Sequence, residues 1–244
     1  MKKIEIKKAI ISGVFGEKKQ KIIFYKVNDF KHAFFFIHGL YSSFFQEKYF
    51  LLVNRLLKNN FSVFLFDRSR IKGYKNNLDY KIKSHFFKGK SFEDEIEDTK
   101  IAFSFFLNLL SKNHKVSIIG FSLGGTLSSF LIKDYQKYIK NIFLFGSGVT
   151  TKNNKRPVVN TYPKKETILK NFSMFKGKII LVQGTNDNVV PSEEAREIIT
   201  NNKNLSFIRK LIILKDVDHQ FKYLKNRESK KINKTIVDIL IKEV

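Results

Sequence analysis

The fold of this chain is decided by Gly120-Phe121-Ser122-Leu123-Gly124-Gly125, which follows the apolar run 116–119 and precedes a helix-like stretch starting at Thr126. A strand, a tight turn and a helix form the context in which Gly-x-Ser-x-Gly holds a nucleophilic serine at the tip of a strand. Gly120 and Gly124 leave room for the two backbones to cross. The stretch therefore predicts Ser122 as a nucleophile above the amino end of a helix, where backbone N–H groups favour negative charge. The alternative is an ordinary glycine-rich turn.

Five further apolar runs surround this stretch and alternate with helix-like segments; they cover 33–37, 62–66, 141–145, 178–182 and 211–214. Short continuous apolar runs are typical of strands that are buried on both faces. Strands that alternate with helices favour a parallel sheet. We therefore predict an α/β fold with a mostly parallel central sheet and helices on both faces. Two strand-like runs near the N-terminus, 4–11 and 21–27, are expected to pair as an antiparallel hairpin.

The segments between these runs predict the helices and loops. Helices are expected over about 44–58, 91–110, 192–201 and from 227 onward. Ser91 begins the second helix, and the acids in its first turns are expected to complement the helix dipole. Residues 68–90 are expected to form a long, basic, irregular loop, and residues 149–175 a short cap or lid insertion over the strand ends.

Length and composition fit one domain over residues 1–244, of which 43% are hydrophobic. No apolar run approaches the ~18 residues needed to span a bilayer. The run 9–15 after the N-terminal lysines is short and has no small-residue cleavage site, so a cytoplasmic location is expected. The chain has no cysteine, which excludes disulfides and thiolate metal sites.

The formal net charge is +24. Nucleic-acid patches usually contain Lys/Arg clusters of about five or more, whereas the lysines here are scattered in ones and twos. We therefore expect no specific nucleic-acid partner. Two interpretations of the charge stay open. One is a compositional bias toward Lys, Asn, Ile and Phe, and the other is a loose contact with an anionic membrane surface.

A serine nucleophile needs a base and an orienting acid. Of the five histidines, His38 and His219 follow expected strands and so share the sheet edge of Ser122. His219 lies in the loop after the last run and is the better base. Asp187 follows the run 178–182 and is the better acid, unless it only stabilises a turn. The order Ser122, Asp187, His219 is the one described for α/β-hydrolases.

The chain resembles the α/β-hydrolase superfamily, in particular small bacterial esterases and monoacylglycerol-lipase-like or lysophospholipase-like serine hydrolases. The resemblance implies an oxyanion hole made by the backbone N–H groups of Leu40 and Leu123, with no metal and no cofactor. One departure is Asp67-Arg68-Ser69-Arg70, where many relatives carry Asp-x-Arg-Gly-x-Gly. The motifs that carry the resemblance are His38-Gly39, Gly120-Phe121-Ser122-Leu123-Gly124-Gly125, Gly184-Thr185-Asn186-Asp187-Asn188-Val189-Val190-Pro191 and Asp218-His219-Gln220-Phe221.

These residues favour hydrolysis of carboxylic esters, with a small-molecule substrate of acyl or monoacyl-lipid type, through an acyl-enzyme. A thioesterase or acyltransferase with the same triad, or a non-catalytic ligand-binding relative, remains open. His38, Gly39, Gly120 and Gly124 are expected to support the site. Apolar residues near the strand ends predict an acyl pocket, and lysines of the insertion predict contact with anionic lipid. The apolar residues are Phe44, Phe45, Phe121, Phe172, Met174 and Phe175; the lysines are Lys152, Lys155, Lys164 and Lys165.

Overall fold

The computed structural model of the chain describes residues 3–30, 32–40, 42–44, 47–70, 84–110, 114, 116–150, 158–201, 208–222 and 229–244. Its centre is an eight-stranded sheet with the order β1-β2-β4-β3-β5-β6-β7-β8. β2 is antiparallel to both of its neighbours, and all the other neighbouring strands are parallel. The predicted α/β fold is therefore confirmed, together with the N-terminal hairpin.

Every predicted strand is present, and most are a few residues longer than the apolar run that predicted them. The strands are β1 Ile4–Ser12, β2 Lys19–Val27, β3 His32–Ile37, β4 Phe61–Asp67, β5 Val116–Phe121, β6 Ile139–Phe145, β7 Lys178–Asn186 and β8 Arg209–Asp218. The helices are α1 Glu47–Lys58, α2 Phe92–Asn108, α3 Leu123–Tyr135, α4 Lys165–Ser173, α5 Ser192–Thr200 and α6 Ser229–Glu243. None of the helices in the described residues is long and apolar enough to cross a membrane.

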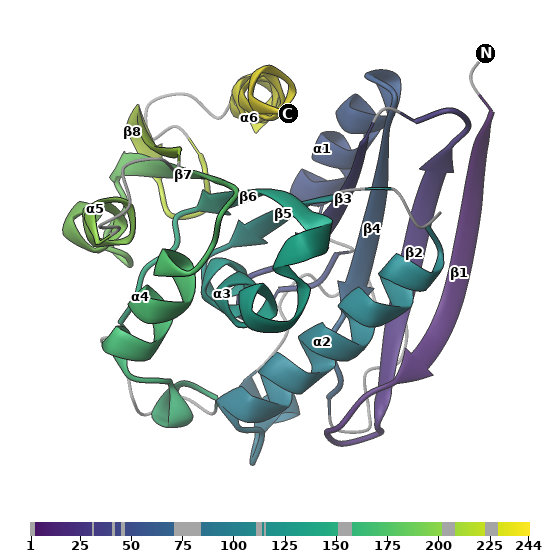
Figure 1. Ribbon diagram of the computed structural model, residues 1–244, viewed down its shortest axis with the longest axis horizontal. Coiled ribbons are helices and arrows are strands. Elements are labelled where there is room, and N and C mark those ends of the chain that lie inside the picture. The colour runs from purple at the N-terminus through teal and green to yellow at the C-terminus, as the bar shows by residue number, and fades with distance from the viewer. Residues whose placement is uncertain are drawn as a thin grey trace.

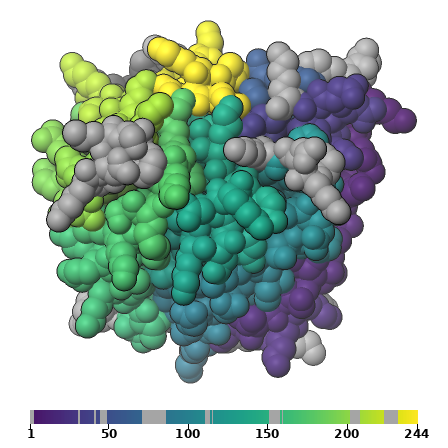
Figure 2. Space-filling model, viewed as in Figure 1, coloured from purple at the N-terminus to yellow at the C-terminus, as the bar shows by residue number. Residues whose placement is uncertain are grey.

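Side chains that alternate along the strands divide the core into two layers. Phe34 and Phe36 of β3 pack with α1 and α6 on one face, while Phe35 and Ile37 pack with α2, α3, α4 and α5 on the other. Figure 1 shows α2 and α3 in front of the sheet and α1 behind it. In the space-filling view these front helices form one continuous face, bordered on its right by the first two strands (Figure 2).

The described part of the expected cap differs from the prediction. Residues 165–173 form α4, which contacts α3 and α5. Ile168, Phe172 and Phe175 of this segment are buried in the same core layer as α3. Their spacing of four and three residues is that of one helix face, so this segment supplies the crossover helix between β6 and β7. Residues 151–157 of the expected cap lie outside the described residues.

The acids in the first turns of α2 have roles that the sequence analysis did not predict. Ser91 caps the helix as expected, and Asp94 completes a capping box with it. Glu95 and Asp98, in contrast, are fully buried. They form ion pairs with Arg68 and Lys90, at the two ends of the segment 68–90 that was expected to be an irregular loop. Residues 71–83 of that segment lie outside the described part of the chain. A role limited to the helix dipole is therefore wrong for these two side chains.

Two buried cations balance these acids. The Nε of Arg68 lies 2.6 Å from Oε2 of Glu95, and Nζ of Lys90 lies 2.7 Å from Oδ2 of Asp98 and 3.3 Å from Oε1 of Glu95. Asp98 also accepts hydrogen bonds from the backbone N–H and the hydroxyl of Ser69, at 2.9 and 2.6 Å. We call Arg68, Lys90, Glu95 and Asp98 the buried charge cluster. It joins the end of β4 to α2.

Replacing Lys90 by methionine is expected to lower the free energy of unfolding by about 3–5 kcal/mol, because it leaves the buried carboxylate of Asp98 without its ion-pair partner. Urea denaturation at neutral pH, followed by circular dichroism, measures the change. The control is Lys88→Met, because Lys88 is exposed. Equal stabilities of the two variants would contradict an energetic role for the cluster.

Candidate active site

Ser122 lies at the turn between β5 and α3, in a backbone conformation that serine rarely adopts. Its φ is 50° and its ψ is −120°. Such a conformation costs on the order of 1–3 kcal/mol and persists only where surrounding structure enforces it. Here the N–H of Ser122 donates to the carbonyl of Phe145, on the neighbouring β6, at 2.9 Å. The turn therefore presents the Ser122 side chain at the carboxyl end of the sheet.

Two glycines permit this turn. A Cβ at Gly120 would lie 2.6 Å from Cα of Gly125, and a Cβ at Gly124 would lie 2.1 Å from the carbonyl oxygen of Ile37. Both distances are far below any van der Waals contact and both involve backbone atoms. Residues with side chains at these positions would push α3 away from β5 and β3, and Ser122 would move with it.

His219 and Asp187 reach Ser122 from two other loops. The Nε2 atom of His219, which follows β8, lies 3.1 Å from Oγ of Ser122. Its Nδ1 atom lies 2.9 Å from Oδ2 of Asp187, which follows β7. Because an ionised carboxylate can only accept, Nδ1 of His219 carries the proton and Nε2 is left to accept the hydroxyl hydrogen of Ser122. The structure thus joins these three predicted residues in one series of hydrogen bonds.

Asp187 is held as a carboxylate by several donors. Its Oδ1 accepts the backbone N–H groups of Val189 and Val190, each at 2.9 Å, and its Oδ2 also accepts from Nε2 of Gln183 at 3.0 Å. Burial alone would raise the pKa of Asp187, but the hydrogen bonds from His219 and from the backbone outweigh it, and the pKa is lowered. The group therefore stays ionised at neutral pH.

Two residues around this pair were missed by the sequence analysis. Gln183 is buried within β7. In the sequence it is an isolated polar residue that follows the apolar run 178–182, and this position could have indicated its role. Gly146 follows β6 with a φ of 54°, and a Cβ there would lie 3.2 Å from Oδ2 of Asp187 and 3.4 Å from Nδ1 of His219. Because Gly146 has no side chain, Asp187 and His219 can lie directly beside the end of β6.

The predicted oxyanion residues lie beside Ser122. Gly39 follows β3, and a Cβ there would lie 3.4 Å from Cβ of Ser122. Leu123 is the first residue of α3, so its N–H has no acceptor within the helix. Gly39, Leu40, Ser122 and His219 line one small pocket of about 50 Å³. The loop after β3 and the amino end of α3 therefore border the same space.

His38 does not line this pocket, and its buried side chain supports the loop from behind. Nη2 of Arg68 lies 3.2 Å from Nδ1 of His38, and Nε2 of His38 lies 3.3 Å from Oδ1 of Asp67. Burial, followed by the charge of Arg68, lowers the pKa of His38 to about 4. The neutral ring therefore lies between the Asp67 carboxylate at Nε2 and, at Nδ1, both the guanidinium of Arg68 and the carbonyl of Gly39, which is 3.0 Å away.

The segment that departs from the family pattern holds the same loop in place. Nη2 of Arg68 donates to the carbonyl of Gly39 at 2.9 Å. Asp67 accepts from the hydroxyl of Ser43 at 2.7 Å and from the N–H of Phe44 at 3.0 Å. Burial would raise the pKa of Asp67, but Arg70, His38 and the other partners lower it. This end of β4 therefore fixes the chain on both sides of Leu40.

A second cavity adjoins the pocket at Ser122. It has a volume of about 40 Å³ and shares Tyr49, Phe121 and Gln220 with the first. Leu52 of α1, Ile232 and Ile236 of α6, and Phe221 supply its remaining apolar wall, and Lys222 and Asn233 complete the lining. The two cavities thus lie side by side, with Tyr49, Phe121 and Gln220 as their common wall.

The predicted acyl wall is only partly found at these cavities. Phe121 lines both of them, whereas Phe172 and Phe175 are buried in the core layer on the opposite face because α4 packs there. Met174 is 37% exposed and lines neither cavity. Lys165 forms an ion pair with Glu197 at 2.5 Å. Phe45, Lys152 and Lys155 lie outside the described residues.

Several solved structures of hydrolases share this fold. A dienelactone hydrolase from Anabaena variabilis aligns over 98% of this chain and 99% of its own, with a TM-score of 0.69 and 14% identity. A Pyrococcus furiosus esterase aligns over 98% and 91%, with a TM-score of 0.68 and 18% identity. A cold-adapted esterase from an Arctic intertidal metagenomic library aligns over 99% and 94%, with a TM-score of 0.70 and 14% identity. Identities this low establish the fold alone.

The sequence itself provides the family. A search among curated proteins finds no match. The profile of the family described as serine hydrolase (FSH1) matches residues 31–215, more than half of the chain. The match contains Ser122 and Asp187 and ends shortly before His219. The chain therefore belongs to the serine hydrolase (FSH1) family and is an esterase-like member of the α/β-hydrolase superfamily.

Proposed function

We propose that this hydrolase cleaves carboxylic esters of acyl or monoacyl-lipid type, with Ser122 as nucleophile, His219 as base and Asp187 as orienting acid. The observation that carries the proposal is the series of hydrogen bonds from Ser122 to His219 and on to Asp187, at 3.1 and 2.9 Å. Three side chains from three separate loops meet at one strained turn. The strained backbone at Ser122 costs free energy, and such strain is typical of catalytic sites, where it holds the reacting groups in position.

Acylation begins when the ester carbonyl enters the small pocket beside Ser122. Nε2 of His219 takes the hydroxyl proton as Oγ attacks the carbonyl carbon. The negative charge moves onto the carbonyl oxygen, and the N–H groups of Leu40 and Leu123 stabilise it there. Removing one such donor typically costs ~2.7–4 kcal/mol of transition-state stabilisation. His219 then gives the proton to the leaving alcohol, and the acyl group stays on Ser122.

Deacylation repeats these steps with water as the nucleophile. His219 takes a proton from water as the water oxygen attacks the acyl carbon, and returns it to Oγ when the acid leaves. Asp187 holds the productive tautomer of His219 and stabilises the imidazolium that forms in both halves. Its lowered pKa suits this role, because the carboxylate keeps its charge when the imidazolium appears beside it.

The apolar cavity between α1 and α6 supports an acyl substrate. It starts at Phe121, next to the nucleophile, and is bordered by Leu52 and Ile236. Burying a hydrocarbon chain is worth about 0.8 kcal/mol per CH₂. A thioesterase or an acyltransferase would use the same cavity, so the leaving group is tested separately below. The names of the structurally similar esterases agree with the proposal.

Ser122→Ala should abolish covalent labelling by a fluorophosphonate probe and hydrolysis of p-nitrophenyl esters, because the attacking oxygen is lost. Gel fluorescence and release of p-nitrophenol measure the two effects. The matched control is Ser128→Ala, a buried serine of α3, the helix that follows Ser122, whose hydroxyl donates to the carbonyl of Gly125. Labelling that persists in Ser122→Ala would place the nucleophile elsewhere.

Asp187→Asn should lower kcat by roughly 10⁴ while the protein stays folded, because the amide favours the wrong tautomer of the histidine. Steady-state kinetics with p-nitrophenyl butyrate measure the loss. Asp216→Asn is the control, since Asp216 lies in the same region and its φ of 60° suits asparagine. Near-normal turnover of Asp187→Asn would show that another carboxylate orients His219.

Ile236→Ala should raise the ratio of kcat/KM for octanoyl over acetyl esters about tenfold, because the larger cavity accepts more methylene groups. Ile168→Ala truncates a fully buried isoleucine in the opposite core layer and should cost stability without changing the ratio. An unchanged ratio in both variants would reject this cavity as the acyl site. Oxygen esters and thioesters of one acyl chain, compared on the wild type, distinguish an esterase from a thioesterase.

A further inference from the structure

The outer strands β1 and β2 carry an apolar face that the helices of the described residues do not cover. Residues opposite each other in an antiparallel pair point to the same face, and Ile6 pairs with Tyr25, Lys8 with Ile23, and Ile10 with Lys21. Ile23 belongs to the core layer of α1 and α6, so this is the face that those helices cover further along the sheet. Over β1 it is open: Ile4, Ile6 and Ile10 are 42%, 54% and 64% exposed.

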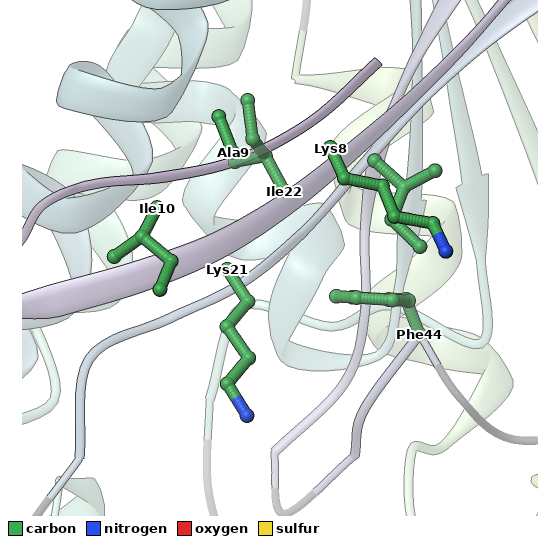
Figure 3. Close-up of a pocket in the computed structure, with 7 residues that line it drawn as sticks. Lys8, Ala9, Ile10, Lys21, Ile22 and Phe44 are labelled. Atoms are coloured by element: carbon green, nitrogen blue, oxygen red, sulfur yellow. The ribbon is translucent and has the colours of Figure 1, made fainter. Parts of the chain in front are cut away.

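A shallow groove of about 300 Å³ runs along this face. The ring of Phe44 and the side chains of Lys8, Ile10, Lys21 and Ile23 line it. Figure 3 shows Ile10, Lys21 and Phe44 on one side of the two strands, and Ala9 and Ile22 on the other. Ala9 and Ile22 contribute to the opposite core layer. The groove therefore belongs to the open face, which we define as the even-numbered residues 4–10 with the odd-numbered residues 19–25.

The charges on the open face have one sign. Lys8, Lys19 and Lys21 point to it, and none of its described strand residues is acidic. Glu5 of β1 points to the other face, where it pairs with Lys7 at 3.5 Å. Isoleucines and lysines thus alternate on one sheet surface, with apolar side chains at the centre and ammonium groups at the ends of long stems.

This combination favours one kind of partner. Exposed apolar patches with polar rims mark protein or membrane contacts. A second copy of the chain would bring lysines against lysines, whereas the interface of an anionic bilayer accepts apolar side chains and attracts each lysine with about 1 kcal/mol. We infer that the open face of β1 and β2 binds the surface of an anionic lipid bilayer, with its isoleucines at the headgroup boundary and the exposed Lys8 and Lys19 at the lipid phosphates.

The position of the face gives this contact a consequence for the candidate site. Lys21 pairs in register with Asp67, at the end of β4 where the supporting contacts of the site begin. Phe44 of the groove lies four residues after Leu40, and its N–H is held by Asp67. The Ile10 and Lys21 end of the face therefore lies at the same edge of the sheet as Ser122. The inference concerns binding alone and stands whether or not esters are the substrate.

The test is flotation of the Ser122→Ala protein with vesicles, so that hydrolysis does not alter the lipid. Vesicles of phosphatidylcholine alone and of phosphatidylcholine with phosphatidylglycerol are compared at low and high salt. Binding is expected on the anionic vesicles at low salt, with loss at high salt as the charges are screened. Absence of binding to anionic vesicles, or binding that is equal on both vesicle types, would overturn the inference.

Matched variants separate the open face from the overall charge. Lys8→Glu should weaken binding by about fivefold or more, given about 1 kcal/mol for each lysine at the surface. Ile6→Ser with Ile10→Ser should weaken it at least about tenfold, since two apolar side chains no longer enter the interface. The controls are Lys215→Glu and Ile213→Ser on the far edge strand β8, where both residues are exposed. They make the same kinds of chemical change, with one isoleucine replaced in place of two, and should leave binding as it was.

Each remaining outcome has a defined meaning. An equal loss in Lys8→Glu and Lys215→Glu would assign binding to net charge, and an equal loss in the two sets of isoleucine variants would remove the apolar role of this face; either result would overturn the inference. A dimer, measured by light scattering, that dissociates in Ile6→Ser with Ile10→Ser would make the face a contact between copies and also overturn the inference. The same variants are also made in the protein that retains Ser122. Their melting temperatures and their rates of p-nitrophenyl acetate hydrolysis should match those of the wild type, which shows that they are folded.

Discussion

The guanidinium group of Arg68 is the contact on which the candidate site depends most. It lies buried between Glu95, at 2.6 Å from its Nε, and the carbonyl of Gly39, at 2.9 Å from its Nη2. A trans peptide is planar, and its C=O and N–H point in opposite directions. A bond that fixes the Gly39 carbonyl therefore also fixes the direction of the Leu40 N–H, the proposed oxyanion donor. The buried charge cluster thus reaches the site through one peptide group.

Such a cluster is costly, because desolvation of each ion opposes folding by several kcal/mol. It is tolerated here because every charge has a partner of opposite sign: Arg68 and Lys90 face Glu95 and Asp98. Apolar side chains of the same volume in place of all four charged residues could stabilise the core equally well. They could not hold the Gly39 carbonyl in one orientation, because they have no hydrogen-bond donor. We therefore interpret the main role of the cluster as positioning the loop after β3. Its contribution to the stability of the domain is secondary to this role.

The sequence predicted those features that depend on local pattern and on sheet topology. Apolar runs located the strands, and the shared carboxyl edge of parallel strands brought Asp187 and His219 to Ser122, although they are far apart in the chain. It failed for Glu95 and Asp98, which were expected to complement the helix dipole, because their partners Arg68 and Lys90 lie outside the helix. It also failed for α4, where many polar residues obscured the apolar face of Ile168 and Phe172. Both errors concern which face of a segment is buried, and that is decided by packing.

Aromatic packing explains how the His219 loop stays aligned with the strand ends beside Ser122 without a covalent link between them. Phe221 follows His219 closely and has a φ of 57°, which turns its ring into the core layer of α1 and α6. There it meets Phe121 edge-on, with ring centroids 5.8 Å apart, and Phe145 at 5.6 Å. Phe121 precedes the nucleophile, and the carbonyl of Phe145 accepts the N–H of Ser122. The ring of Phe221 therefore ties the base loop to the two strand ends that define the position of Ser122. Movement of His219 away from Ser122 would have to break this apolar contact first, so the distance between base and nucleophile is maintained by the core itself.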